Sequence, residues 1–378
     1  MWYDLLRSTL ESLNFSRSEY DMCVFSRQTD RGRTVLTVHV DDVKIFAPND
    51  SERERVISEL SELFPGLKIH RGPELNYLGM KFEYRPDGTV GISMPGYTKA
   101  ISDCDDIKRA NATLAVEELY DIDDESEPLD AEEHEEFHST VCKLLYLGKM
   151  VRNELLGAVN FLCSRTQAPT KQDQRKLKKV LGYLKGTPGL GLNLGADEDL
   201  FVRLSVDASY GVHADGKSHT GACVTLGRGA THATSTKQRI VNKASTEAEL
   251  VAASGMYGQG IWTVRLLESI GAKVQGLILE QDNLSTIALM KNGKPNSSRS
   301  RHIAIRYFFI HDKIKDNEVK VIHRPSEELT ADILTKPLAV ERFNDLRDAL
   351  LKTTSCASAR SVLQVAHERD LRRTRELA

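Results

Sequence analysis

Four short motifs in the second half of the chain each contain a carboxylate in a setting that suggests chemistry. They are Val206-Asp207-Ala208-Ser209, Thr246-Glu247-Ala248-Glu249-Leu250, Glu280-Gln281-Asp282-Asn283 and Ala331-Asp332-Ile333-Leu334-Thr335-Lys336. Asp207 and Asp282 end predicted strands, whereas Asp332 and one of the two glutamates Glu247 and Glu249 lie on predicted helices. Acids at these positions can converge in one place. Converging carboxylates can hold paired divalent metal ions, an arrangement that hydrolyses phosphodiesters.

Each of these acids also has a structural interpretation. Asp207 could begin a turn, Asp332 could be an exposed helical residue, and Asp282 could cap the next helix, a role compatible with ligation. Glu247 and Glu249 lie about 200° apart around a helix, so only one of them can face the site squarely.

A second carboxylate pair lies near the amino terminus. The β-rich segments 34–38 and 43–46 flank Asp41 and Asp42 and predict a hairpin with both acids at its turn. The alternative is a charged turn without function. We take Asp41 as the first metal-ligand candidate and Asp42 as the weaker one.

Composition limits the class of protein. The chain has 378 residues, enough for two or three domains, with 40% hydrophobic and 28% charged residues, as in globular proteins. Its six cysteines form no C-x-x-C pair, which argues against a zinc site or a disulfide framework. With no signal-peptide layout and no long apolar segment, we expect an intracellular protein, cytoplasmic or nuclear, that is neither secreted nor membrane-bound.

The net charge of −3 conceals strong segregation of charge along the chain. Residues 117–136 hold twelve acidic residues and no Lys or Arg, whereas two later segments are basic. The basic segments predict contacts with a phosphate backbone, or alternatively solvated helix faces. The candidate contacts are Arg165, Lys171, Arg175, Lys178, Lys179, Lys185, Arg299, Arg301, His302 and Arg306, with Lys237 and Gln238 after a later strand.

The order of predicted elements indicates an α/β chain. Three consecutive strands near 201–206, 221–226 and 230–235 are followed by alternating helices and strands, which implies one mixed sheet with flanking helices. The acidic segment 117–136 has few large apolar residues and reads as a linker. The charged residues 353–378 read as a tail.

With these residues identified, the chain resembles the end of the Pol polyprotein of copia-type LTR retrotransposons over nearly all of residues 1–352. The resemblance is carried by the order and spacing of several strings. They are His39-Val40-Asp41-Asp42, Tyr77-Leu78-Gly79-Met80, Tyr183-Leu184-Lys185-Gly186-Thr187, Ser245-Thr246-Glu247-Ala248-Glu249-Leu250, Asp282-Asn283-x-Ser285, Arg301-His302-Ile303-x-Ile305-Arg306-Tyr307 and Ala331-Asp332-Ile333-x-Thr335-Lys336-Pro337-Leu338.

This resemblance implies a division of the chain into parts. Residues 1–116 correspond to an α+β remnant of a reverse transcriptase palm and thumb, and residues 137–198 to a helical connection beyond the acidic linker. Residues 199–352 correspond to a ribonuclease H-like domain with a mixed five-stranded sheet and flanking helices.

The resemblance also assigns an activity. Asp207, Glu249, Asp282 and Asp332 become catalytic ligands of two Mg²⁺ or Mn²⁺ ions that cut RNA in RNA–DNA hybrids. Glu249 is favoured over Glu247 because the family's catalytic Glu is followed by Leu and small residues. His323 corresponds to a mobile histidine that aids product release. The implied partners are an RNA–DNA hybrid, an RNA template and the upstream part of the polyprotein.

The departures from the family concern the first site. His39 stands where the family has Tyr, and polymerisation requires a further aspartate from an earlier strand. None of Asp4, Asp21 and Asp30 has the matching context. With the fingers and much of the palm missing, we expect no DNA synthesis by this chain alone. The competing hypothesis for the whole chain is an inert remnant that only binds nucleic acid.

Overall fold

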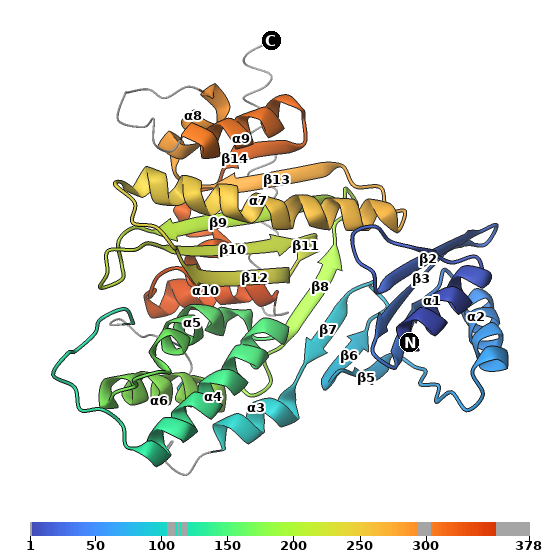
Figure 1. Ribbon diagram of the computed structural model, residues 1–378, viewed down its shortest axis with the longest axis horizontal. Helices are drawn as coiled ribbons and strands as arrows, with labels where there is room; N and C mark the ends of the chain where they lie inside the picture. The colour runs from blue at the N-terminus through green and yellow to red at the C-terminus, as the bar shows by residue number, and fades with distance from the viewer. Residues whose placement is uncertain (1, 104–109, 112–113, 115–118, 294–303, 353–378) are drawn as a thin grey trace.

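The fold is taken from a computed structural model that describes residues 2–103, 110–111, 114, 119–293 and 304–352, with only the backbone for 304–308. Its strands form three sheets joined by a layer of helices (Figure 1). Among the described residues, no helix has both the length and the apolar character needed to cross a bilayer.

The first sheet is antiparallel, in the order β1-β2-β3-β4. Its strands are β1 (Ser16–Arg17), β2 (Val24–Thr29), β3 (Gly32–His39) and β4 (Asp42–Phe46). Helices α1 (Trp2–Ser12) and α2 (Asp50–Leu63) pack on it around Leu10, Leu36 and Val56. His39 pairs with Asp42, so β3 and β4 form the predicted hairpin with Val40 and Asp41 at its turn.

The second sheet combines strands from the three expected parts of the chain, residues 1–116, 137–198 and 199–352. It has the order β11-β8-β7-β6-β5, with strands β5 (Glu74–Tyr77), β6 (Met80–Tyr84), β7 (Val90–Ser93), β8 (Leu192–Ala196) and β11 (Gly227–Arg228). Strand β8, which the sequence placed in a helical connection, pairs with β7 and β11. The connection is therefore built into its neighbours on both sides.

A layer of helices packs beside the sheets, in the lower part of Figure 1. It comprises α3 (Pro95–Ser102), α4 (Ala131–Met150), the 3₁₀ turn η1 (Asn153–Leu155), α5 (Leu156–Arg165) and α6 (Lys171–Gly186). Their apolar faces share one core that includes Leu144, Val159 and Leu181. Within it, Arg152 and Glu154 form a fully buried ion pair of 2.6 Å.

The acidic segment differs from the expected linker. Helix α4 begins at Ala131, within the segment, because the Asp130 carboxylate accepts hydrogen bonds from the amides of Glu132 and Glu133. Leu119 and Tyr120 are buried in the core of the helical layer. An interpretation based on acidic composition therefore missed the helix cap at Asp130 and the two core residues Leu119 and Tyr120.

The third sheet has the order β12-β10-β9-β13-β14. Its strands are β9 (Phe201–Ser209), β10 (His219–Thr225), β12 (Ala230–Lys237), β13 (Gly276–Gln281) and β14 (Val319–His323). Strands β9, β10 and β12 are antiparallel neighbours, whereas β13 runs parallel to both β9 and β14. This arrangement confirms the predicted five-stranded mixed sheet.

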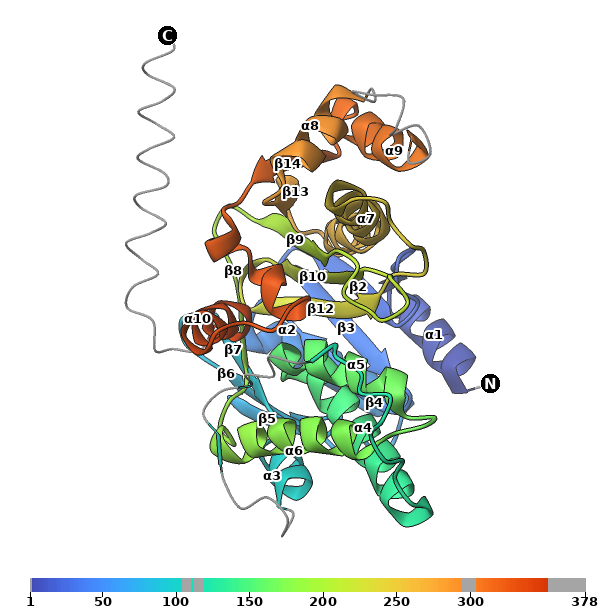
Figure 2. The ribbon, with the colours of Figure 1, turned by 90° about the vertical axis from the view of Figure 1, so that its left-hand side faces the viewer.

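Helices cover both faces of this third sheet (Figure 2). One face packs on α7 (Ser245–Ser269), α8 (Leu284–Asn292) and α9 (Ala304–Lys315) around Leu204 and Val206. The 3₁₀ turn η4 (Thr330–Leu334) and helix α10 (Val340–Leu351) lie on the other face. Because side chains alternate along β9, Ser205 and Asp207 point to the side of η4.

Two polar contacts connect helix α7, which packs on the third sheet, with the loop between β1 and β2 of the first sheet. The indole of Trp262, on α7, donates a hydrogen bond of 2.9 Å to the carbonyl oxygen of Tyr20. The hydroxyls of Ser18 and Ser269 lie 2.8 Å apart. Helix α7 thus connects the two regions that carry the predicted carboxylate sites.

Gly221 permits the close approach of η4 to the sheet, which suggests a stability test. A Cβ atom there would lie 2.6 Å from Cγ2 of Thr335 and 2.9 Å from the carbonyl oxygen of Ala331. We expect Gly221→Ala to lower the free energy of unfolding by about 1–3 kcal/mol, measured by urea denaturation, because η4 must move.

The matched control is Gly258→Ala, since no atom lies within 4 Å of a Cβ at that position on α7. The control should raise stability by about 0.5–1 kcal/mol, because Ala favours helix. Equal midpoints for Gly221→Ala and the wild type would show that η4 is not held against the sheet.

Candidate metal centre

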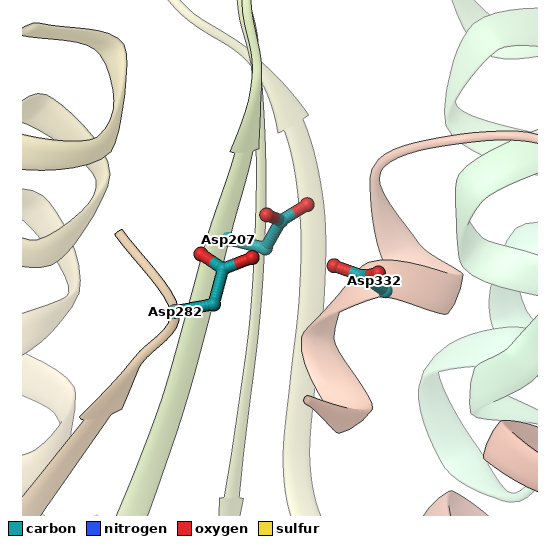
Figure 3. Close-up of side chains that lie close together, drawn as sticks. All are labelled: Asp207, Asp282 and Asp332. Carbon is teal, nitrogen blue, oxygen red and sulfur yellow. The ribbon is translucent and has the colours of Figure 1, made fainter. Parts of the chain in front are cut away.

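Parallel pairing of β9 and β13 brings the first two acids together. Ser205 is the register partner of Glu280, so Asp207 and Asp282, each two residues further on, reach the same edge of the sheet. The two side chains lie next to one another in Figure 3. Asp207 is buried and Asp282 half-buried.

Asp332 joins them from η4. One carboxylate oxygen from each of Asp207, Asp282 and Asp332 lies within 4.8 Å of the other two, and the three side chains come from three separate elements (Figure 3). Asp332 has no exposed surface. Three acids separated widely in the chain therefore form one buried cluster.

Glu249 completes the group from the first turns of α7. Its carboxylate accepts a hydrogen bond of 3.2 Å from the amide of Gln281. Burial, together with the negative charges of Asp207 and Asp282, raises the pKa of Glu249 to about 9. Glu247 accepts a hydrogen bond of 2.7 Å from the backbone amide of Lys243 instead, so Glu249 is the glutamate that faces the aspartates.

The donor set fits hard divalent cations. Burial and the charge of Asp207 raise the pKa of Asp332 to about 7, although Lys336 and Arg342 oppose the shift. Oδ1 of Asp332 is buried and faces the ammonium of Lys336. Mg²⁺ and Mn²⁺ prefer such carboxylate oxygens, and a cation would relieve the repulsion that raises these pKa values.

Polar residues that we did not predict hold the acids in place. The Thr335 hydroxyl donates to Oδ2 of Asp207, and the Ser326 hydroxyl donates to Oδ2 of Asp282 over 2.5 Å. Arg342 binds Oδ2 of Asp332, and the ammonium of Lys336 lies 3.1 Å from its Oδ1. Thr335 and Lys336 stand in the quoted motif and could have been assigned, whereas nothing in the sequence marks Ser326 or Arg342.

A buried chain of aromatic and imidazole groups lies behind the cluster. The Tyr120 hydroxyl donates to the carbonyl oxygen of Thr335 over 2.9 Å, and its ring packs on His213 and His219. A hydrogen bond of 3.0 Å joins the two imidazoles, and His219 lies 2.6 Å from the Ser235 hydroxyl. Burial lowers the pKa of His213 to about 4 and that of His219 to about 3.

The structure places His323 at the end of β14, in register with Gln281, the residue before Asp282. His323 is exposed and is not one of the three clustered residues. Its predicted role in product release thus stays a prediction.

The hairpin acids form a different kind of site. Asp41 and Asp42 are exposed, and no third acid, cysteine or histidine gathers with them among the described residues. They line a cavity of about 550 Å³ together with the side chain of Lys44. The Lys44 ammonium lies 3.3 Å from the centre of the Phe82 ring, and burial lowers its pKa to about 8.

Several predicted nucleic-acid contacts are occupied by the protein itself. Gln238 is buried and donates to Thr220 and to the carbonyl oxygen of Ala248, so its prediction as a contact is corrected. Three predicted cations form ion pairs: Arg165 with Asp173 at 3.2 Å, Lys171 with Glu133 at 2.5 Å, and Lys237 with Asp215 at 2.9 Å. These pairs make the three cations weaker candidates for phosphate binding.

Two other predicted contacts are exposed, since Arg175 and Lys179 lie one turn apart on the surface of α6. Lys185 is exposed and Lys178 half-buried, and each already has an interaction within the protein. Arg306 lies in α9, where only the backbone is described. Arg299, Arg301 and His302 lie outside the described residues.

No model of a protein family matches the chain. Among solved structures, it is similar to ribonuclease H1 from Halobacterium salinarum, with 14% identity, a TM-score of 0.26, and coverage of 36% of this chain and 94% of that one. It is also similar to the prototype foamy virus protease-reverse transcriptase, with 11% identity, a TM-score of 0.24, and coverage of 80% of this chain and 37% of that one.

Curated relatives cover most of the chain. The retrovirus-related Pol polyprotein from transposon TNT 1-94 of Nicotiana tabacum is 27% identical over 351 residues, covering 90% of this chain and 26% of its own length. That from transposon RE1 of Arabidopsis thaliana is 29% identical over 358 residues, covering 91% and 23%. The chain thus spans about a quarter of these relatives, and its homologues are Pol polyproteins, which confirms the resemblance.

The two buried imidazoles predict a loss of stability in acid. Since their pKa values lie below the value of about 6.5 in an unfolded chain, the unfolded state binds more protons between pH 6.5 and 3. Their contribution is complete above pH 6.5 and is lost as the pH falls, at up to about 1.4 kcal/mol per pH unit for each group. Urea denaturation at pH 7 and 4.5 measures it.

The variant His219→Gln should lose less stability than the wild type between these two pH values, because Gln does not titrate. The exposed His138 provides the matched control. His138→Gln should behave as the wild type does. The same acid loss in all three proteins would contradict the assignment.

Proposed function

We propose that this chain, whose homologues are Pol polyproteins of copia-type retrotransposons, hydrolyses the RNA strand of RNA–DNA hybrids as a ribonuclease H. The observation that carries the proposal is the meeting of Asp207, Asp282 and Asp332 within 4.8 Å, with Glu249 beside them. Crowded carboxylates repel one another, so they favour the binding of divalent cations. Divalent cations held by carboxylates catalyse the hydrolysis of phosphodiesters.

Asp207, Glu249, Asp282 and Asp332 would hold two Mg²⁺ or Mn²⁺ ions. When bound, such ions activate a water nucleophile and stabilise the leaving oxygen. The chain's own residues orient the ligands: Thr335 fixes Asp207, Gln281 fixes Glu249 and Ser326 fixes Asp282. Carboxylates held by such hydrogen bonds do not have to be reorganised during the reaction.

The substrate would be held by its backbone and its shape. Exposed cations such as Arg175 and Lys179 can contact phosphates without reading sequence. An RNA–DNA hybrid is distinguished by its helical form and by the 2′-hydroxyls of the RNA strand. His323, which is exposed at the end of β14, would aid release of the product. The upstream polyprotein is the proposed partner at the hairpin site.

The hybrid-cleavage test compares the wild type with Asp207→Asn in Mg²⁺. We expect the substitution to lower the cleavage rate by at least about 100-fold, because it removes a ligand charge at the centre of the cluster. A labelled RNA strand annealed to DNA reports the rate on a gel.

The control is Asp312→Asn, which changes an exposed aspartate on α9 and should cleave as the wild type does. Cleavage at the wild-type rate by Asp207→Asn would place the activity elsewhere. If none of the proteins cleaves the hybrid, the alternative of an inert binding remnant is favoured.

For the hairpin acids, in contrast to the distal cluster, we expect no catalytic activity in polymerisation. Asp41 and Asp42 have no third ligand among the described residues, and paired catalytic ions need more than an exposed dyad. We expect no primer extension on an RNA template by this chain alone, measured with a labelled primer under conditions in which hybrid cleavage is active. Extension that is lost in Asp41→Asn would refute this expectation.

A further inference from the structure

The ammonium of Lys336 lies inside the carboxylate cluster. Its Nζ atom is 3.1 Å from Oδ1 of Asp332 and 3.6 Å from Oδ2 of Asp207. It therefore lies between two of the acids to which the proposed function assigns divalent ions. A positive charge of the protein itself already neutralises part of the centre.

Arg342 is the contrasting cation. Its guanidinium binds Oδ2 of Asp332 and also donates a hydrogen bond of 2.7 Å to the carbonyl oxygen of Ser326. Because Arg342 has two anchors and a rigid planar head, it fixes Asp332 from the side. Arg342 is positioned to stay when ions bind.

Lys336 is held in a different way. The ammonium contacts the carboxylates themselves, through an ion pair and a hydrogen bond with Asp332 and a longer ion pair with Asp207. About a third of the Lys336 side chain is exposed. Its flexible four-carbon stem allows the ammonium to move into solvent without a change of backbone.

A divalent ion bound by these two carboxylates would be repelled by this ammonium. At separations of 3–4 Å in a partly buried site, repulsion between a divalent ion and a unit charge is strong and poorly screened by solvent. We propose that Lys336 is a displaceable counter-cation, a positioning residue that competes with divalent ions for Asp207 and Asp332. This inference rests on the proposed ion-binding function of the same centre.

Two opposite effects of removing the charge follow. Without ions, Asp207 and Asp332 lose a neutralising partner, and the free protein becomes less stable. With ions, no ammonium has to be expelled, and binding becomes tighter. A purely structural lysine would produce only the first effect.

The experiment measures binding of Mg²⁺ alone by calorimetry, and thermal unfolding with and without a chelator. We expect Lys336→Met to bind Mg²⁺ at least fivefold more tightly than the wild type and to unfold at a lower temperature than the wild type in chelator. Addition of Mg²⁺ should raise its unfolding temperature by more than it raises that of the wild type. Lys336→Arg keeps the charge and should bind less tightly than Lys336→Met. Lys320→Met, an exposed change on β14, should match the wild type.

The outcomes separate the two proposals. Equal or weaker Mg²⁺ binding by Lys336→Met, with binding by the wild type that Asp207→Asn abolishes, overturns the role of Lys336 and leaves the centre intact. No Mg²⁺ binding by any variant overturns the centre itself. If Lys336→Met does not fold, Lys336→Gln provides the uncharged variant, and the same comparisons decide.

Discussion

Repulsion among buried carboxylates is the constraint on which the rest of this structure depends. The parallel register of β9 and β13 forces Asp207 and Asp282 to the same edge, and η4 adds Asp332 where solvent cannot screen it. Burial and mutual repulsion raise the pKa of Glu249 and of Asp332, so protonation reduces the negative charge of the cluster. Because divalent cations bind carboxylates in their ionised form, ion affinity and pH are linked.

The packing around the sheet resists this repulsion. Helix α7 positions Glu249 from one face, while η4 and α10 position Asp332 from the other, and each is anchored in a different core. Gly157 on α5 lets the helical layer approach the carbonyl oxygen of Ile333 in η4. Helix α5 thus packs against the turn that carries Asp332, and β8 pairs with β11, so the connection contacts the region that follows it.

The sequence predicted what depends on local pattern. Alternation and apolar runs located the strands of the mixed sheet. The family resemblance, not local pattern, favoured Glu249 over Glu247, and the structure turns Glu247 toward the backbone amide of Lys243. Long-range packing was beyond these patterns. Gln238 looked like a surface amide because its partner Thr220 comes from the neighbouring strand, and Tyr120 was hidden in an acidic segment although it packs beneath Thr335. Ion pairs such as Lys171 with Glu133 likewise need the fold to be seen.

The contrast between the two acidic sites argues for where ion chemistry is concentrated in this chain. Asp41 and Asp42 lie in an exposed turn, where solvent screens their repulsion and little free energy is available to attract an ion. The distal acids are buried or half-buried, and hydroxyl donors fix Asp207 and Asp282, so each charge there is screened less by solvent and creates a stronger field. A field of that strength would attract any available cation, and the protein supplies one in Lys336. Its ammonium stabilises the ion-free cluster, and its flexible stem leaves the site open to a stronger competitor.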